Sequence, residues 1–286
     1  MTDWMSGTHT SRAIMSALSK IPSQSYGILQ RGAASTMLDQ AVEQVRVLGY
    51  ATLDAGYADS ELDAISKTFD ASLASYQSEH GLPFLKDLDE HNNIRLMSTR
   101  GDGMFLRLAL NPNLLQVLGK LITGKFILNQ QNGIVNPPKE DYNQGAWHRD
   151  LPYQHFTSST PLAINALFCV DDFTFENGAT FVLPASHKSA EFPSDAYVQK
   201  NAVQIPAKAG QFILLDCMTF HSGGYNASNK VRRAVNHLYN IPYFKQQINI
   251  PASVDGAGLS PQAREILGFD FQEPKTLGEF FGTRKK

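Results

Sequence analysis

The chain has 286 residues, of which 42% are hydrophobic and 18% charged, and its formal net charge is −2. This composition allows a large buried core, and the balance of acidic and basic residues argues against nucleic acid or an anionic membrane as a partner. The two cysteines are too few for a disulfide framework. No apolar run is close to the length of about 20 residues that a membrane helix needs. Because the first 20 residues also lack a signal-peptide pattern, we expect a cytoplasmic protein.

The first third of the chain predicts an arm followed by helices. Residues 1–35 are rich in Ser, Gly and Thr, which predicts a loosely ordered arm with one short helix at 11–19. From residue 36 to 286 we expect one domain. The spacing of apolar residues and a possible N-cap at Asp59 or Ser60 predict helices at 36–47, 60–75 and 114–121, with a short strand at 49–53.

Between about residues 125 and 245 the pattern changes to short apolar stretches separated by Gly, Pro and Asn. Short strands with turn signals predict an antiparallel sandwich or barrel, and the absence of long helical patterns between them disfavours a parallel α/β fold. The chain is therefore predicted to be mainly β with flanking helices, including a short helix at 261–267. The expected strands are Phe126–Val135, Leu162–Val170, Ala179–Leu183, Gln211–Leu215 and Val231–Tyr239.

Common nucleotide and zinc motifs are not found in the sequence. The segment Gly119–Phe126 resembles a phosphate loop, but Phe126 stands where a Ser or Thr would hold magnesium. There is no Gly-x-Ser-x-Gly, Cys-x-x-Cys or His-Glu-x-x-His pattern.

A candidate metal site begins at His148-Arg149-Asp150. Residues two apart on a strand point to the same face, so His148 and Asp150 could bind one ion. A single His-x-Asp is a weak signal, but His221 follows a later apolar strand and supplies a third ligand. Two His and one carboxylate form the facial triad of non-haem Fe(II) oxygenases, which leaves positions open for a cosubstrate and O₂.

Arg232 is the candidate partner for the far carboxylate of such a cosubstrate. It follows His221 after a turn rich in Gly, Asn and Ser, so the two residues can lie on neighbouring strands. A planar guanidinium binds a carboxylate through two hydrogen bonds, which suits 2-oxoglutarate. Alternation places Arg232 with Ala234 and Asn236, whereas Arg233 is expected to be a surface charge in a turn.

These motifs, in this order, resemble the phytanoyl-CoA dioxygenase (PhyH) family of Fe(II)/2-oxoglutarate-dependent oxygenases. The segment Leu48–Leu53 resembles the N-terminal unit of the family, and Trp147-His148-Arg149-Asp150 resembles its iron motif. The chain departs from the family at Ala185, where Gly is usual. Two further matches are Asp171–Thr180 followed by Leu183–His187, and His221–Gly224 followed by Asn226 and Arg232.

The resemblance implies a double-stranded β-helix (jelly-roll or cupin-like) core with Fe(II) held by His148, Asp150 and His221. It also implies that Arg232 binds the C5 carboxylate of 2-oxoglutarate, with help from Thr180. A third implied contact is a hydrogen bond from Gln131, although Gln130 or Asn132 could take that role. His187 would be structural, and the carboxylate of Asp150 disfavours halogenation.

The activity implied is that of a dioxygenase that hydroxylates, or otherwise oxidises, an unactivated C–H bond of a small molecule in specialised metabolism. It would consume O₂ and 2-oxoglutarate and release succinate and CO₂. Desaturation, cyclisation or epimerisation within the same family is an alternative, and a non-catalytic jelly-roll that binds a ligand or metal is another. The substrate, the site of oxidation and the oligomeric state stay open.

Residues around the iron motif give further expectations. Arg149 alternates away from the iron ligands and is expected in a salt bridge. Three residues that follow the iron motif are expected at the mouth of the substrate pocket: Tyr153, His155 and Phe156. Five residues that precede the core could close over the substrate: Met97, Arg100, Met104, Phe105 and Arg107.

Overall fold

We describe the protein from a computed structural model, in which residue 22 and residues 24–285 are placed well enough to be described. The helix expected at 11–19, and most of the expected arm, lie outside these residues. The chain divides into two units, Met1–Ala33 and Ala34–Lys286, and the helices and strands below belong to the second. Within the described residues, no helix has the length and apolar composition needed to cross a membrane.

The expected elements are largely present, and several short helices join them. The helix at 261–267 has the predicted bounds, whereas the one expected at 60–75 runs on to His80. Its N-cap is Ala58, whose backbone N–H donates to the carboxylate of Glu61 over 2.9 Å. The helices are α2 (Met37–Leu48), α3 (Asp59–His80), α4 (Leu82–Asp87), α5 (Met104–Ala109), α6 (Pro112–Leu121), α7 (Asp195–Asn201), α8 (Pro261–Leu267) and α9 (Leu277–Gly282).

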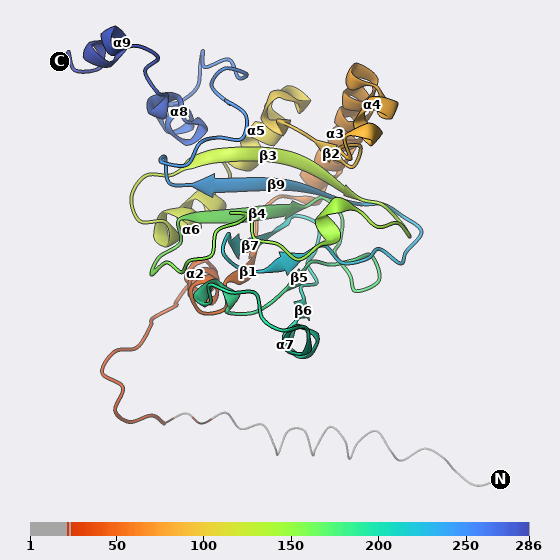
Figure 1. Ribbon diagram of the computed structural model, residues 1–286, viewed down its shortest axis with the longest axis vertical. Coiled ribbons are helices and arrows are strands. Elements are labelled where there is room, and N and C mark those ends of the chain that lie inside the picture. Colours follow the sequence, from red (N-terminus) through yellow and green to blue (C-terminus); the bar gives the residue numbers. More distant parts are fainter. Residues whose placement is uncertain (1–21, 23, 286) are drawn as a thin grey trace. The chain divides into compact units, whose positions relative to one another are not determined.

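The strands form two antiparallel sheets (Figure 1). The larger sheet has the order β1-β7-β4-β9-β3-β2, and the smaller has the order β6-β5-β8. Neighbours in the larger sheet are distant in sequence, so its register depends on tertiary contacts. The strands are β1 (Tyr50–Asp54), β2 (Asn93–Ile94), β3 (Ile127–Asn136), β4 (Ala163–Cys169), β5 (Phe181–Val182), β6 (Val203–Gln204), β7 (Gln211–Asp216), β8 (His221–Ser222) and β9 (Arg232–Asn240).

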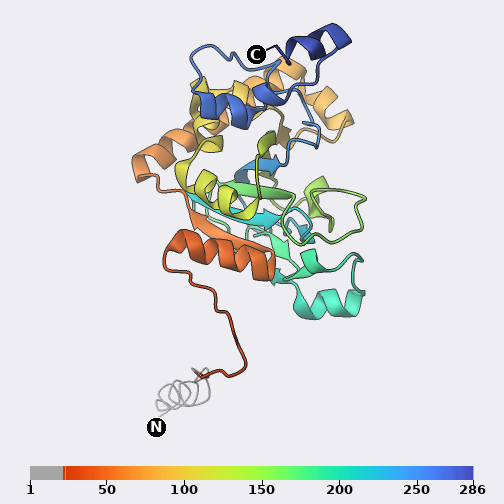
Figure 2. The ribbon, with the colours of Figure 1, turned by 90° about the vertical axis from the view of Figure 1, so that its left-hand side faces the viewer.

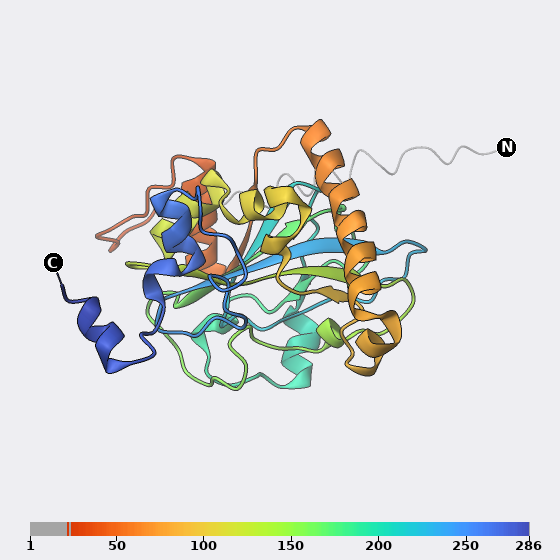
Figure 3. The same ribbon diagram turned by 90° about the horizontal axis from the view of Figure 1, so that it is seen from above.

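One face of the larger sheet is covered by helices and forms the main core. Seen from above, α3 runs across this face of the sheet (Figure 3). At the edge of the sheet α2 packs beside β1 and α6 (Figure 2). Phe168, Phe212 and Tyr239 from the strands join the helix residue Phe105 in one buried cluster. Phe105 is therefore part of the core and does not close over a substrate, contrary to expectation.

The other face of the larger sheet looks toward the smaller sheet. Ile213 and Ala234 from the larger sheet share a second apolar cluster with Ala179 and Val182, which precede and form β5. The expected alternation along β9 is present, because Val235 and Tyr239 lie in the helix-covered cluster while Ala234 lies in this one.

His237 on the helix-covered face predicts an acid-sensitive stability. Its Nδ1 bonds the carbonyl of Ala166 over 3.0 Å, and burial lowers the pKa of His237 to about 4. As the pH falls, the histidine of the unfolded chain, with its ordinary pKa, takes up a proton before the buried His237 does. The stability that neutral His237 contributes is therefore complete above about pH 6.5 and is lost by about pH 4. The loss amounts to about 3 kcal/mol.

We expect His237→Gln to flatten this part of the stability profile, measured by urea unfolding between pH 4 and 7. His155 is an exposed histidine, and His155→Gln serves as the control that keeps the slope. Equal slopes in the wild type and His237→Gln would contradict the assignment.

Candidate active site

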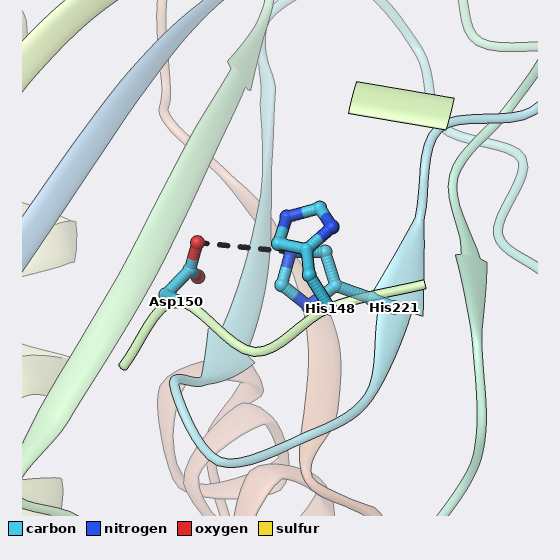
Figure 4. A group of neighbouring side chains, drawn as sticks. All are labelled: His148, Asp150 and His221. Carbon is cyan, nitrogen blue, oxygen red and sulfur yellow. Dashed lines mark ion pairs between the residues drawn. The ribbon is translucent and has the colours of Figure 1, made fainter. Parts of the chain in front are cut away.

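The structure brings His148, Asp150 and His221 together (Figure 4). The two histidines are opposite each other in an antiparallel bridge, with reciprocal backbone N–H···O bonds of 2.9 and 3.0 Å. His221 Nε2 lies 3.8 Å from Asp150 Oδ1, and one candidate ligand atom from each of the three residues lies within 4.8 Å of the others. This is the spacing that a single ion needs to contact all three side chains.

Hydrogen bonds orient the three side chains. Each imidazole uses Nδ1 toward a backbone carbonyl: His148 toward Ala146 over 2.8 Å, and His221 toward Thr219 over 3.0 Å. A carbonyl can only accept, so Nδ1 carries the proton and Nε2 keeps the lone pair that binds metal. Burial also lowers the pKa of His221, which favours the neutral imidazole that binds a metal.

The carboxylate of Asp150 is fixed in a similar way. Asn165 on β4 donates from Nδ2 to Asp150 Oδ2 over 2.8 Å, while Oδ1 is the oxygen nearer His221. The amide thus occupies one carboxylate oxygen and leaves the other for an ion. Partners of this kind tune both the orientation and the affinity of a metal site.

Arg232 lies in the same pocket and lacks an anionic partner. It is 2% exposed, and its Cζ lies 3.9 Å from the centre of the Phe173 ring. Nη2 donates to Tyr142 Oη over 3.2 Å, but the buried Nε has no hydrogen-bond partner. Among the described residues no carboxylate lies within ion-pair distance of Arg232, and burial lowers its pKa. A buried cation without an anion nearby carries an uncompensated desolvation cost, which an anionic ligand would offset.

The pocket that holds the triad and Arg232 is also lined by Thr180, as expected. It contains four polar residues that sequence reasoning did not assign: Tyr142, Gln144, Asn165 and Asn236. The alternation of Arg232, Ala234 and Asn236 was a usable signal for Asn236. No comparable signal marks Tyr142, because it lies in an irregular segment between β3 and His148.

Gln131 does not reach this pocket. Its Nε2 lies 2.6 Å from the carbonyl of Phe105 and 2.8 Å from His237 Nε2, on the helix-covered face of the sheet. The neighbouring Asn132 is paired with Asn236 in the register of β3 and β9, so it shares the pocket-facing side. Gln130 lies two residues from Asn132, and the two side chains bond each other over 3.1 Å. Neither of these alternatives lines the pocket of the triad, so the amide contact to the cosubstrate stays a prediction.

Several other expectations are wrong. Arg149 makes no salt bridge with any residue in the described part of the chain and instead donates to backbone carbonyls, beginning with Met218 at 2.7 Å. Arg233 is not a free surface charge, because it is ion-paired with Asp171 and Asp70. At the expected pocket mouth, Tyr153 is 92% exposed and does not line the pocket.

Residues 45–234 match the family model described as phytanoyl-CoA dioxygenase (PhyH). The chain belongs to the phytanoyl-CoA dioxygenase family. An uncharacterized protein of Mycobacterium tuberculosis, Rv1501, is 30% identical over 255 residues, which cover 86% of this chain and 92% of that protein. Dioxygenase af480 of Aspergillus fumigatus is 26% identical over 246 residues, covering 80% of this chain and 76% of that enzyme.

Two solved structures illustrate the fold. EctD from S. alaskensis, determined with 2-oxoglutarate and 5-hydroxyectoine, has a TM-score of 0.60 at 19% identity, covering 75% of this chain and 79% of EctD. The non-heme alpha-ketoglutarate-dependent epimerase SnoN from nogalamycin biosynthesis has a TM-score of 0.57 at 19% identity, covering 78% and 90%. At 19% identity, these similarities support the fold of the chain and do not indicate its substrate.

Proposed function

We propose that this PhyH-family protein is an Fe(II)- and 2-oxoglutarate-dependent dioxygenase that oxidises an unactivated C–H bond of a small molecule. The observation that carries the proposal is the buried Arg232 without an acidic partner, in one pocket with the His148–Asp150–His221 triad. A site for a metal alone would not need this cation. We further propose that the two facing sheets form a double-stranded β-helix.

The donor set fits a ferrous ion. Two neutral imidazole nitrogens and one carboxylate oxygen are the ligands of non-haem Fe(II) oxygenases, and hydrogen bonds from the protein already select the required tautomers. When bound, the ion would supply O₂ activation coupled to the decarboxylation of 2-oxoglutarate to succinate and CO₂.

The protein's own side chains would then bind and orient the cosubstrate. Arg232 would pair with the far carboxylate, and Thr180, which lines the same pocket, would add a hydroxyl donor. Asn165 would hold the carboxylate of Asp150 at a constant angle during turnover. Leu167 and Leu215 also line the pocket, and such apolar walls limit the access of water.

The proposal is tested by anaerobic titration of the protein with Fe(II) and 2-oxoglutarate, followed by a substrate screen scored by succinate release. A visible charge-transfer band that needs both components is the expected first result. The products then separate the outcomes: hydroxylation adds an oxygen, desaturation or cyclisation removes two hydrogens, and epimerisation leaves the mass unchanged. Metal binding without the band would instead favour a non-catalytic binding protein.

We expect Tyr142→Phe to weaken 2-oxoglutarate binding specifically. Arg232 donates to the oxygen of Tyr142, so the phenolic hydrogen is free to bond a carboxylate held by Arg232. Burial raises the pKa of Tyr142, which keeps this hydrogen in place. Hydrogen bonds to charged groups contribute about 1.5 kcal/mol or more, which is about a tenfold rise in the dissociation constant.

Calorimetry with Mn(II) and 2-oxoglutarate in the absence of O₂ measures this effect. The matched control is Tyr153→Phe, since Tyr153 is 92% exposed and lies outside the pocket. Equal affinities in the two variants would exclude the phenol from the cosubstrate site.

A further inference from the structure

Arg149 stands between two triad residues in sequence, but its side chain points away from the pocket that they line. It is 5% exposed, and its Cζ lies 3.8 Å from the centre of the Phe220 ring. A guanidinium has five N–H donors, and here there is a carbonyl for each. Nε donates to Met218 (2.7 Å), Nη1 to Gln154 (3.2 Å) and Ala190 (3.0 Å), and Nη2 to Ser186 (3.1 Å) and Ser189.

Two of these contacts reach the turn that carries His221. Met218 and Phe220 flank Thr219, whose carbonyl accepts the hydrogen bond from His221 Nδ1 over 3.0 Å. Arg149 bonds the carbonyl before this acceptor and stacks on the ring after it. The guanidinium therefore fixes the acceptor that in turn orients the His221 ring.

The other contacts brace the same turn from a second segment. Residues 186–190 supply three of the five carbonyls, and Ser186 Oγ accepts from the backbone N–H of Phe220 over 2.9 Å. The fifth carbonyl belongs to Gln154, in the loop that leaves Asp150. One side chain thus connects the segment bearing His148 and Asp150 to the segment bearing His221.

Bulk and charge alone do not account for an arginine here. Among the described residues no carboxylate forms an ion pair with Arg149, so its charge is balanced by carbonyl dipoles. An apolar side chain would fill the space at a lower desolvation cost. A lysine would keep the charge but has only three donors and no planar fork, so it could not serve five carbonyls.

We propose that Arg149 is a positioning residue for the metal site, which sets the distance and angle of His221 relative to His148 and Asp150. The inference rests on the proposed function in one respect, namely that the triad binds a divalent metal. It adds that metal affinity depends on a residue that touches neither the metal nor the cosubstrate.

The test is Co(II) binding to the full-length chain, with Arg149→Lys as the variant. Loss of a partner that orients a ligand weakens metal affinity by about 10- to 100-fold, and we expect an effect of this size together with altered visible bands of the Co(II) complex. The matched control is Arg233→Lys, because Arg233 is a half-buried arginine that also bonds several groups, but on the helix-covered face. It should lower the melting temperature and leave Co(II) affinity unchanged.

Each outcome decides between the two proposals. The positioning role would be overturned if Arg149→Lys kept the Co(II) affinity and visible bands of the wild type. It would also be overturned if Arg233→Lys lost as much Co(II) affinity as Arg149→Lys. His148→Ala should abolish binding, and if it binds Co(II) normally the proposed function itself fails. If Arg149→Lys does not fold, Phe220→Leu removes the stacked ring while all five carbonyls remain. It should weaken Co(II) binding measurably, and an unchanged affinity would overturn the positioning role.

Discussion

His148→Ala should abolish substrate-dependent succinate production. His148 supplies one of three candidate ligand atoms that lie within 4.8 Å of one another, and no other His, Cys, Asp or Glu of the described residues belongs to that cluster. Losing a ligand should cost more than the about 10- to 100-fold that follows when only a supporting partner is lost. The measurement is succinate formed under Fe(II), ascorbate and O₂ with the substrate found by screening.

The matched control for this variant is His155→Ala. His155 is exposed, lies seven positions further on and is absent from the pocket lining, so its loss should leave activity near that of the wild type. Because His148 is only partly buried and lies outside the two sheets, the substitution should leave the fold intact, which circular dichroism can verify. Full succinate production by a folded His148→Ala protein would refute the proposed function.

Arg232→Met should change ligand affinity and stability in opposite directions. Truncating one member of a buried charge pair costs about 2–5 kcal/mol of binding, so 2-oxoglutarate should bind about 30-fold more weakly or worse. In the ligand-free protein, however, Arg232 is a buried cation whose Nε has no partner. Replacing it with an apolar residue should leave the melting temperature unchanged or raise it.

Thermal shift with and without 2-oxoglutarate and Mn(II) measures both effects in one experiment. Pyruvate, which has the keto acid but not the far carboxylate, should bind the wild type and Arg232→Met equally. The control is Arg233→Met, which breaks the ion pairs with Asp171 and Asp70 and should lower the melting temperature without altering 2-oxoglutarate affinity. Retained 2-oxoglutarate affinity in Arg232→Met would assign that arginine another role.

The triad and Arg232 could be found from the sequence because strand alternation and motif order constrain them. The two-residue period paired His148 with Asp150, and His221 and the motif order strengthened that weak signal. The face of Arg232 followed from its alternation with Ala234 and Asn236. Gln131 could not be placed in the same way, because three consecutive amides, Gln130, Gln131 and Asn132, fit the family motif equally well, and only the pairing of β3 with β9 shows that Gln131 faces the helices.

Arg149, Arg233 and Tyr142 were beyond sequence reasoning for a different reason. Their partners lie far along the chain, as with Arg149 and Met218 or Arg233 and Asp70. Burial of a charged side chain depends on such contacts, and charge patterning reports only the average tendency of arginines to be exposed. The same limit explains the wrong prediction for Phe105. The sequence suggested that it closes over the substrate, but tertiary contacts bury it in the main core.

The direct backbone pairing of His148 with His221 has an evolutionary consequence. In an antiparallel pair, adding or removing one residue turns every following side chain to the opposite face. A single-residue insertion between His148 and Asp150 would therefore turn one of these two side chains away from the other ligands, however well the rest of the molecule tolerated it. Length changes among descendants of this gene should accumulate in the loop from 151 to 162 and around α7, and be purged from the short span 148–150.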